Sequence, residues 1–451
     1  MSDMTPRSDA ITRYVTGLDY GQLPDPVVDM ARQCLADFLA VSIAAHDNQA
    51  VMPVRALAAS WGADGNAPVI MGKQSAAPVA ALVNGTMAHA LDLDDVHHLG
   101  GGHPSAPCWA SVFSSAAARG ASEDRAITAF VAGYEVMTRL GGGGPNGVGR
   151  SLHFRGFHPT SVFGRTGATV GAGLLLGLAE PEMANALGLV GTTAGGLVNS
   201  FGTHAKPFHA GKAAMDGVIA AELAASGMQS AHNLYEIGTG LLPVLLDPAR
   251  PDIPALDFGS QWYLLENGFK MYSCCRATHA SIEAAQEISS NLAVSQIAEV
   301  DIFICPSALV VAGIERPTTG VEGRFSVAYC ASMALHGYRM LPDDFDKRAP
   351  ADVRVDLLLD KITCRPTDDM PEGTARISVK TVDGQTREAT VNVMKGHPER
   401  PLGWAGVEDK FMMLCAPVLG DEKAGRLFQF TKGFSASEKS FSRMIPLLAA
   451  G

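Results

Sequence analysis

One segment of the chain gathers side chains that are well suited to ligand binding and proton transfer. Residues 203–213 read THAKPFHAGKA, so lysines and histidines stand together between apolar residues. The next carboxylate along the chain is Asp216. A buried ammonium such as that of Lys206 costs free energy unless an anion meets it. We therefore expect a negatively charged ligand to supply the anion, in contact with Lys206 and His209.

A second segment, residues 92–104, places carboxylates beside imidazoles in the run DLDDVHHLGGGHP. This pairing suits general acid and base catalysis, because a neighbouring carboxylate can move the pKa of an imidazole toward the working pH. The same side chains also bind metals. However, Asp92, Asp95 and His98 lie close to an expected helix end, where carboxylates often only cap the helix. We favour the acid–base interpretation and expect no metal.

His158 follows the run RGF and directly precedes an apolar segment with helical periodicity. The N-terminus of a helix attracts anions through its unpaired N–H groups and its dipole. One interpretation is therefore that His158 faces a bound anion. The other is that Thr160 or Ser161 caps the helix and His158 is a surface loop residue. The local sequence supports both equally.

Other chemistries find little support in the sequence. The glycine-rich run over residues 142–151 formally fits phosphate-binding patterns, but those patterns follow a strand, and residues 127–140 have a helical pattern. Cys274 and Cys275 are adjacent rather than spaced as a redox or zinc pair, and no GxSxG motif is present. The histidine, lysine and aspartate side chains need no organic cofactor. They suit removal of a proton next to a carboxylate, followed by elimination, decarboxylation or reprotonation.

The composition is that of a globular protein with an excess of acidic residues. Of 451 residues, 47% are hydrophobic and 18% are charged, and the formal net charge of −11 argues against a nucleic-acid surface. The most apolar stretch, residues 168–179, is far shorter than the roughly 20 residues of a membrane-spanning helix, and no secretory signal is visible. We therefore expect a cytoplasmic protein without nucleic-acid or membrane partners.

The elements that must position these residues are mainly helices. Helical periodicity runs through residues 7–246, whereas residues 247–261 carry three prolines and break the pattern. Three later segments have strand patterns, and a turn at Asp383 and Gly384 joins the last two into a hairpin. The expected strands are residues 298–305, 375–382 and 387–393. The expected helices include a helix after Asp25 and Pro26 and others at about residues 75–92, 105–119, 123–139, 159–178, 181–193, 210–226, 279–292, 325–336 and within 407–448.

This order of elements predicts a mainly α fold with two domains. Residues 1–265 and 400–451 would together form a large all-helical domain. Residues 266–399 would form a smaller α+β lid domain that is inserted between these two segments.

Several long motifs, in order along the chain, carry a resemblance to a known family. They are NGTMAHALDLDD (84–95), GHPS (102–105), RGFHPT (155–160), KPFHAGKAA (206–214), KMYSCCRATH (270–279), FSVAYC (325–330) and GHP (396–398). By these motifs the chain resembles the MmgE/PrpD family over essentially its whole length. The family includes 2-methylcitrate dehydratase, cis-aconitate decarboxylase and iminodisuccinate epimerase. The resemblance implies a homodimer, no required metal, and an active site between a helical domain and a lid.

The resemblance also implies roles for individual residues. His103 and His158 match the acid–base pair of the family. Asp92 matches an aspartate that shapes the site, and Lys206 matches the residue that binds a substrate carboxylate. The substrate-binding residues that we expect are His98 and His209 from the helical domain, and Arg276, His279 and Tyr329 from the lid.

Some positions depart from the pattern of decarboxylase-like members. Val96 and Val327 stand where those members have threonine and tyrosine, and the loop over residues 97–102 is one residue longer. These differences argue against assuming cis-aconitate decarboxylase.

We therefore expect a cofactor-independent lyase that acts on a small di- or tricarboxylate, in the manner of 2-methylcitrate dehydratase or cis-aconitate decarboxylase. The first alternative is an epimerase or isomerase of a dicarboxylate, which begins with the same proton abstraction. The second is a non-catalytic helical scaffold in which the histidines only pack. The sequence leaves open which histidine is the base.

Overall fold

The computed structural model of the chain is mainly helical, as expected, and divides into two units. It describes residues 6–62, 64–100, 102–144, 147–238, 240–246, 253, 255–348, 352–435 and 440–449. The first unit comprises Met1–Ala90, Asp94–Gly268 and Gly403–Gly451, and the second comprises Leu91–Leu93 and Phe269–Leu402. About half of the proline-rich stretch 247–261 lies outside the described residues. The domain boundaries that we expect from the sequence stay a prediction.

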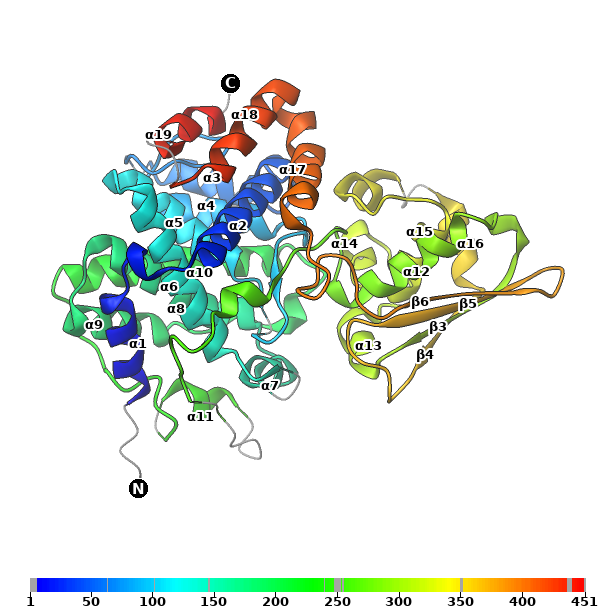
Figure 1. Cartoon of the computed structure of the whole chain (residues 1–451), viewed down its shortest axis with the longest axis horizontal. Helices are drawn as coiled ribbons and strands as arrows, with labels where there is room; N and C mark the ends of the chain where they lie inside the picture. Colours follow the sequence, from blue (N-terminus) through cyan, green and yellow to red (C-terminus); the bar gives the residue numbers. More distant parts are fainter. Residues whose placement is uncertain are drawn as a thin grey trace. The chain divides into compact units, whose positions relative to one another are not determined.

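Helices make up most of the first unit (Figure 1). They are α1 (Arg7–Gly17), α2 (Asp25–Ala44), α3 (Met52–Ser60), α4 (Ala77–His89), α5 (Ser105–Arg119), α6 (Glu123–Leu140), α7 (Val148–Phe154), α8 (Pro159–Leu176), α9 (Glu180–Gly191), α10 (Ala205–Ala225), α11 (Leu241–Leu245), α17 (Gly403–Leu419), α18 (Asp421–Lys432) and α19 (Ser440–Met444). The unit is not entirely helical, because β1 (Val96–His97) pairs with β2 (Asn267–Gly268). Strands of two residues leave no periodicity in a sequence, so the sequence does not predict this pair.

Helix α10 begins earlier than the sequence pattern indicates. We expect a helix over residues 210–226, whereas α10 starts at Ala205. Pro207 lies in the first turn, where its missing N–H costs nothing and its fixed φ favours the helix. Lys206 and His209 therefore belong to the start of α10 rather than to a preceding loop.

Close packing of α10 against α4 and α8 brings several helix ends together. Gly211 makes the contact with α4 possible, since a Cβ there would lie 2.2 Å from Leu82 O and from Thr86 Oγ1. His89 ends α4 about one turn beyond this contact, and Lys206 lies about one turn before Gly211 in α10. The last turn of α4 and the first turn of α10 therefore meet.

The C-terminal segment packs on the N-terminal helices of the same unit. In Figure 1, α17 (orange) lies along α2 (blue). A buried ion pair joins them, with 2.5 Å between Lys410 Nζ and Asp37 Oδ1, and Trp404 Nε1 donates a hydrogen bond to Asp29 Oδ1 at 2.8 Å. Both ends of the chain therefore build the helical unit, as expected. None of the helices that the structure describes is both long and apolar enough to cross a membrane.

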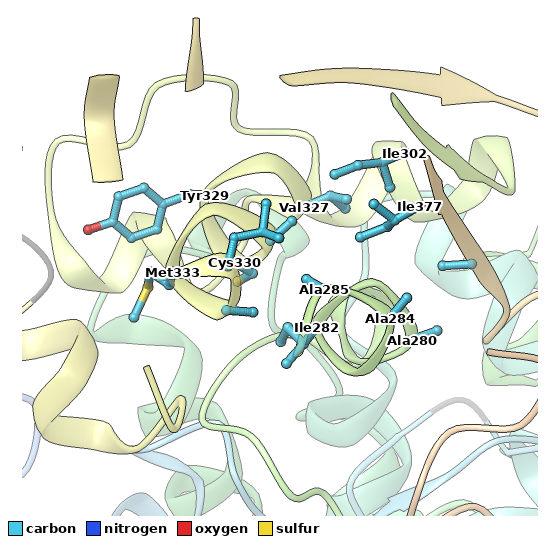
Figure 2. Packing of buried hydrophobic residues seen from close by; sticks show 14 of the residues in the cluster. Ala280, Ile282, Ala284, Ala285, Ile302, Val327, Tyr329, Cys330, Met333 and Ile377 are labelled. Atoms are coloured by element: carbon cyan, nitrogen blue, oxygen red, sulfur yellow. The ribbon is translucent and has the colours of Figure 1, made fainter. Parts of the chain in front are cut away.

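The second unit combines a four-stranded sheet with helices. Its strands are β3 (Ile297–Ile304), β4 (Ile362–Pro366), β5 (Ala375–Thr381) and β6 (Thr386–Val391), in the order β4-β3-β5-β6. Its helices are α12 (His279–Ser289), α13 (Pro306–Ala312), α14 (Gly320–Gly323), α15 (Val327–Leu335) and α16 (Val353–Leu359). Figure 2 shows Ile302 and Ile377 of the sheet facing Ala284 of α12 and Val327 of α15 across the core. Only the β3–β4 pair is parallel.

Candidate active site

Five side chains with possible chemistry lie at helix ends of the first unit. His89 is the last residue of α4, and His158 immediately precedes the first residue of α8. Lys206 and His209 lie in the first two turns of α10, and His103 precedes α5 by two residues. Because α10 packs against α4, α5 and α8, these ends converge.

A buried carboxylate, Asp94, lies between two of these imidazoles. Its Oδ2 accepts a hydrogen bond from His89 Nδ1 at 2.8 Å. It also lies 3.4 Å from His103 Nδ1, within ion-pair distance but outside hydrogen-bond geometry. Although burial by itself raises it, the pKa of Asp94 is held well below its usual range by the imidazoles of His89 and His103. Asp94 is therefore an anion that can orient both rings.

The imidazole of His158 lies near positively charged groups, whereas that of His103 lies near the negative charge of Asp94. Its ring stacks on that of His89 with centroids 5.7 Å apart, and its Nδ1 lies 3.2 Å from Nδ1 of His209. Burial, reinforced by His89 and Lys206, lowers the pKa of His158 well below its ordinary value. Burial, with Arg165 and Lys206 nearby, also lowers the pKa of His209 to about 4. Both rings are therefore neutral near pH 7, so each keeps a nitrogen lone pair that can accept a proton.

This burial also rules out one of the two interpretations of residues 158–161. His158 is only 2% exposed, so it is not a surface loop residue. Thr160 Oγ1 accepts a hydrogen bond from the His103 backbone N–H at 3.1 Å, and Ser161 Oγ accepts one from Arg165 at 2.7 Å. These hydroxyls hold neighbouring parts of the site, and the capping interpretation is wrong.

Lys206 places a positive charge at the positive end of a helix dipole. Its side chain is buried, in the first turn of α10, and its Nζ lies 5.1 Å from the centroid of the Phe201 ring. Asp216, the next carboxylate in the sequence, binds Arg165 at 2.9 Å and also pairs with Lys212. An anion beside Lys206 would meet both the ammonium and the helix N-terminus.

Asp92 belongs to the second unit, unlike Asp94. Its carboxylate lies 3.1 Å from the buried Nζ of Lys270. Its backbone is left-handed, with φ of 50°, a conformation that aspartate adopts more readily than most residues other than glycine. The buried ion pair with Lys270 holds the carboxylate in place. The site role of Asp92 stays a prediction.

The remaining residues that we expect from the sequence are placed as follows. His98 lies in the first unit, where its ring stacks on His97 with centroids 6.1 Å apart. In the second unit, Arg276 begins a short 3₁₀ turn, and the buried ring of His279, at the start of α12, packs edge-on against Tyr272. Figure 2 shows Tyr329 at the margin of the second unit's core, with its hydroxyl turned away from Cys330. Their substrate-binding roles stay predictions.

Two residues of the cluster were not assigned a role from the sequence. His89 and Asp94 both lie in the motif NGTMAHALDLDD, but their spacing gives no reason to pair them. The helix ends at His89, and the turn that follows brings Asp94 back to its ring. A spacing rule for a continuous helix does not detect a contact made across a helix end.

The cluster also has the donor set of a metal site. Ligand atoms of His89, Asp94 and His103 all lie within 4.8 Å of one another. A cation bound by Asp94 would, however, compete with the hydrogen bond from His89 and with the nearby His103 Nδ1. The carboxylate of Asp94 is already in contact with His89 and His103, so no step of the proposed reaction uses a metal.

The lowered histidine pKa values predict that stability depends on pH. A buried histidine of low pKa is protonated first in the unfolded state, so the free energy of unfolding falls as the pH drops below the ordinary pKa. Burial, with Arg150 and Lys206, lowers the pKa of His153 from 6.5 to about 4. This shift corresponds to a loss of at most about 3 kcal/mol. We expect urea unfolding to show the loss between pH 6.5 and about 4.

Two variants separate this effect from general acid sensitivity. His153→Gln combined with His209→Gln should lose less stability than the wild type over the same pH range. Val244→Ala, at an exposed position without a titratable group, should keep the wild-type dependence of the free energy of unfolding on pH. If the free energy of unfolding depends on pH equally in the wild type and in the double variant, the lowered pKa values are contradicted.

Comparisons with known proteins agree with the motifs. The family model described as MmgE/PrpD N-terminal domain matches residues 9–254, and the MmgE/PrpD C-terminal domain matches residues 272–431. A cis-aconitate decarboxylase-like protein, oryM, of Aspergillus oryzae is 25% identical over 461 residues, covering 95% of each chain. The human cis-aconitate decarboxylase is 25% identical over 458 residues, covering 96% of this chain and 92% of its own. The Aspergillus terreus cis-aconitate decarboxylase is 26% identical over 362 residues, covering 75% and 73%.

The matched regions contain the whole histidine cluster together with Asp94 and Lys206. They also contain the sheet of the second unit. The chain therefore belongs to the MmgE/PrpD family.

Proposed function

We propose that the protein is a cofactor-independent lyase that moves a proton on the carbon next to a carboxylate of a small di- or tricarboxylate. One observation carries this proposal. The same cluster keeps one imidazole, His158, neutral beside Lys206, and holds another, His103, beside the ionised Asp94. Acid–base catalysis needs a neutral base that can accept a proton and a separate acid that can donate one, and these two environments suit those roles.

Binding begins with a substrate carboxylate at Lys206, where the ammonium and the first turn of α10 both favour an anion. Burial is the main cause of the low pKa of His158, and the bound carboxylate offsets the positive charge of Lys206 that lowers it further. The proton affinity of His158 therefore rises when substrate is present. Charge that develops on the substrate during proton removal is stabilised by the same ammonium.

His158 is then the base and His103 the acid. Asp94 Oδ2, 3.4 Å from His103 Nδ1, places a carboxylate beside the ring that donates the proton. The side chain of His103 is 14% exposed, so a ligand can reach it, whereas that of Asp94 is only 2% exposed. In a dehydration, His158 takes the proton from carbon and His103 gives one to the hydroxyl, which leaves as water. In a decarboxylation, carbon dioxide leaves its bonding electrons on carbon, and His103 protonates that carbon.

The relatives named as cis-aconitate decarboxylases support a lyase and favour decarboxylation. Val96 and Val327 differ from decarboxylase-like members, so dehydration stays within the proposal. The alternative remains an epimerase, in which a second imidazole returns the proton to the opposite face. The homodimer and the cytoplasmic location stay predictions.

Incubation of the protein with cis-aconitate, 2-methylcitrate and iminodisuccinate in deuterated water tests the function. NMR would detect release of carbon dioxide, loss of water, or deuterium in an unchanged diacid. We expect one of the first two outcomes with one of the first two compounds. Deuterium exchange into iminodisuccinate alone would support the epimerase instead. No reaction with any of the three would contradict the substrate class.

A further inference from the structure

Phe201 lies among the cationic and imidazole groups of the site, although neither the motifs nor the proposed chemistry assigns it a role. Its half-buried ring has the Nζ of Lys206 5.1 Å from its centroid. The ring of His158 meets it edge-on, with centroids 5.0 Å apart and planes at 83°. His153 contacts it as well, with centroids 5.8 Å apart. One aromatic ring therefore touches both the proposed carboxylate binder and the proposed base.

The backbone fixes Phe201 in this position. Residues 196–198 pair with the loop before α8: the His158 N–H donates to Gly196 O at 2.9 Å, and the Val198 N–H donates to Gly156 O at 2.9 Å. Gly196 has φ of 110°, and a Cβ there would lie 2.4 Å from Ser161 Oγ. The segment that carries Phe201 is therefore tied to His158 by main-chain hydrogen bonds and by close packing.

The chemistry of the ring suits this location. An aromatic face attracts an ammonium without carrying a negative charge of its own. A carboxylate in the same place would hold Lys206 more strongly, but it would compete with a substrate carboxylate. The edge-on contact with His158 restricts the orientation of the imidazole.

We propose that Phe201 is a positioning residue that sets the distance between Lys206 and His158, and so between a bound carboxylate and the carbon that is deprotonated. This inference rests on the proposed function. It differs from simple packing because it requires the electron-rich face of the ring, and not only its volume. Loss of the ring would weaken carboxylate binding through Lys206 and lower kcat through His158.

A double-mutant cycle on ligand binding tests the inference. The probe is propane-1,2,3-tricarboxylate, which has no hydroxyl to lose, and its binding is measured by calorimetry. Phe201→Leu should weaken binding about 5- to 20-fold when Lys206 is present, and less than twofold in a Lys206→Met background. Phe201→Tyr should bind within about twofold of the wild type. Equal losses in both backgrounds would overturn the proposal.

A second variant separates the electronic effect of the ring from the effect of its shape. Trifluorophenylalanine at position 201 preserves the shape of the ring and weakens its attraction for a cation. We expect binding to weaken, and kcat measured separately from KM to change less than in Phe201→Leu. Phe154→Leu is the matched control, because Phe154 is 52% exposed and packs against His153 and Arg150. If the fluorinated protein binds propane-1,2,3-tricarboxylate with unchanged affinity, Phe201 only fills space and has no positioning role.

The outcomes separate this inference from the proposed function. If Lys206→Met alone leaves tricarboxylate binding unchanged, the carboxylate-binding role of Lys206 fails, and the proposed function with it. If Lys206→Met weakens binding and Phe201→Leu does not, only the positioning role of Phe201 fails.

Discussion

Replacement of Asp94 by asparagine is expected to lower kcat by about 10²- to 10⁴-fold, which is the range that general acid–base catalysis contributes. The carboxylate accepts the hydrogen bond from His89 Nδ1 and lies 3.4 Å from His103 Nδ1. An asparagine of the same shape carries no negative charge, so it removes the anion that accepts the hydrogen bond from His89 and lies beside His103. KM should change by only a few-fold, because Asp94 does not bind the carboxylate. Steady-state kinetics on the substrate identified by NMR would measure both constants.

The neighbouring residue provides a matched control. Burial, with Asp37 and Asp94 nearby, raises the pKa of Asp95 well above its usual range, so burial disfavours the charged form of this carboxyl group. It interacts with the backbone N–H and the hydroxyl of Ser105, at 3.1 and 2.6 Å. Asp95→Asn keeps a side chain of the same shape beside Ser105, away from the imidazoles, and should leave kcat within a few-fold. Similar losses in both variants would mean that Asp94 acts through folding rather than through its charge.

Lys206→Met is expected to weaken binding of a substrate carboxylate by about 10- to 100-fold, the range for loss of one hydrogen bond to a charged group. Methionine keeps an apolar side chain of similar length in the buried site. Calorimetry with propane-1,2,3-tricarboxylate, together with KM for the reactive substrate, would measure the loss. The loss should shrink at high salt if it is electrostatic.

Lys212→Met is the control on the same helix. Lys212 is 39% exposed and pairs with Asp216, which keeps Arg165 as a partner when the lysine is removed. Its replacement should change affinity by less than twofold. If Lys212→Met weakens binding as much as Lys206→Met does, the effect is one of net charge and not of a specific contact.

Much of the fold follows from residues that act locally. Helix α5 runs from Ser105 to Arg119, as expected, because Gly120 takes the left-handed conformation that ends a helix. The β5–β6 hairpin is confirmed, and Gly384 supplies the positive φ of its turn. Strand β4 was not expected, since Ile362–Pro366 is short, partly exposed and ends in proline. Its pairing with β3 is parallel and is decided by the tertiary fold.

The candidate site was only partly predictable. Motif resemblance and residue type indicated His103, His158, Lys206 and His209, and the structure places them at converging helix ends of one unit. The order of residues could not show that Asp94 faces two imidazoles, because this contact forms across the end of α4. The lowered pKa values of His158 and His209 are caused mainly by burial, which cannot be read from the sequence.

The most direct test of the central claim is deuterium transfer between solvent and the substrate carbon next to the carboxylate. In deuterated water, the wild type should place deuterium on that carbon of the recovered substrate in a dehydration, through reversal of the proton removal, and on the product in a decarboxylation, through protonation after carbon dioxide leaves. In a dehydration, His158→Gln should reduce the rate of this transfer at least about 100-fold while propane-1,2,3-tricarboxylate still binds, and in a decarboxylation His103→Gln should do so. If the folded His158→Gln protein in a dehydration, or the folded His103→Gln protein in a decarboxylation, transfers deuterium at the wild-type rate, the claim that this cluster moves the proton is contradicted.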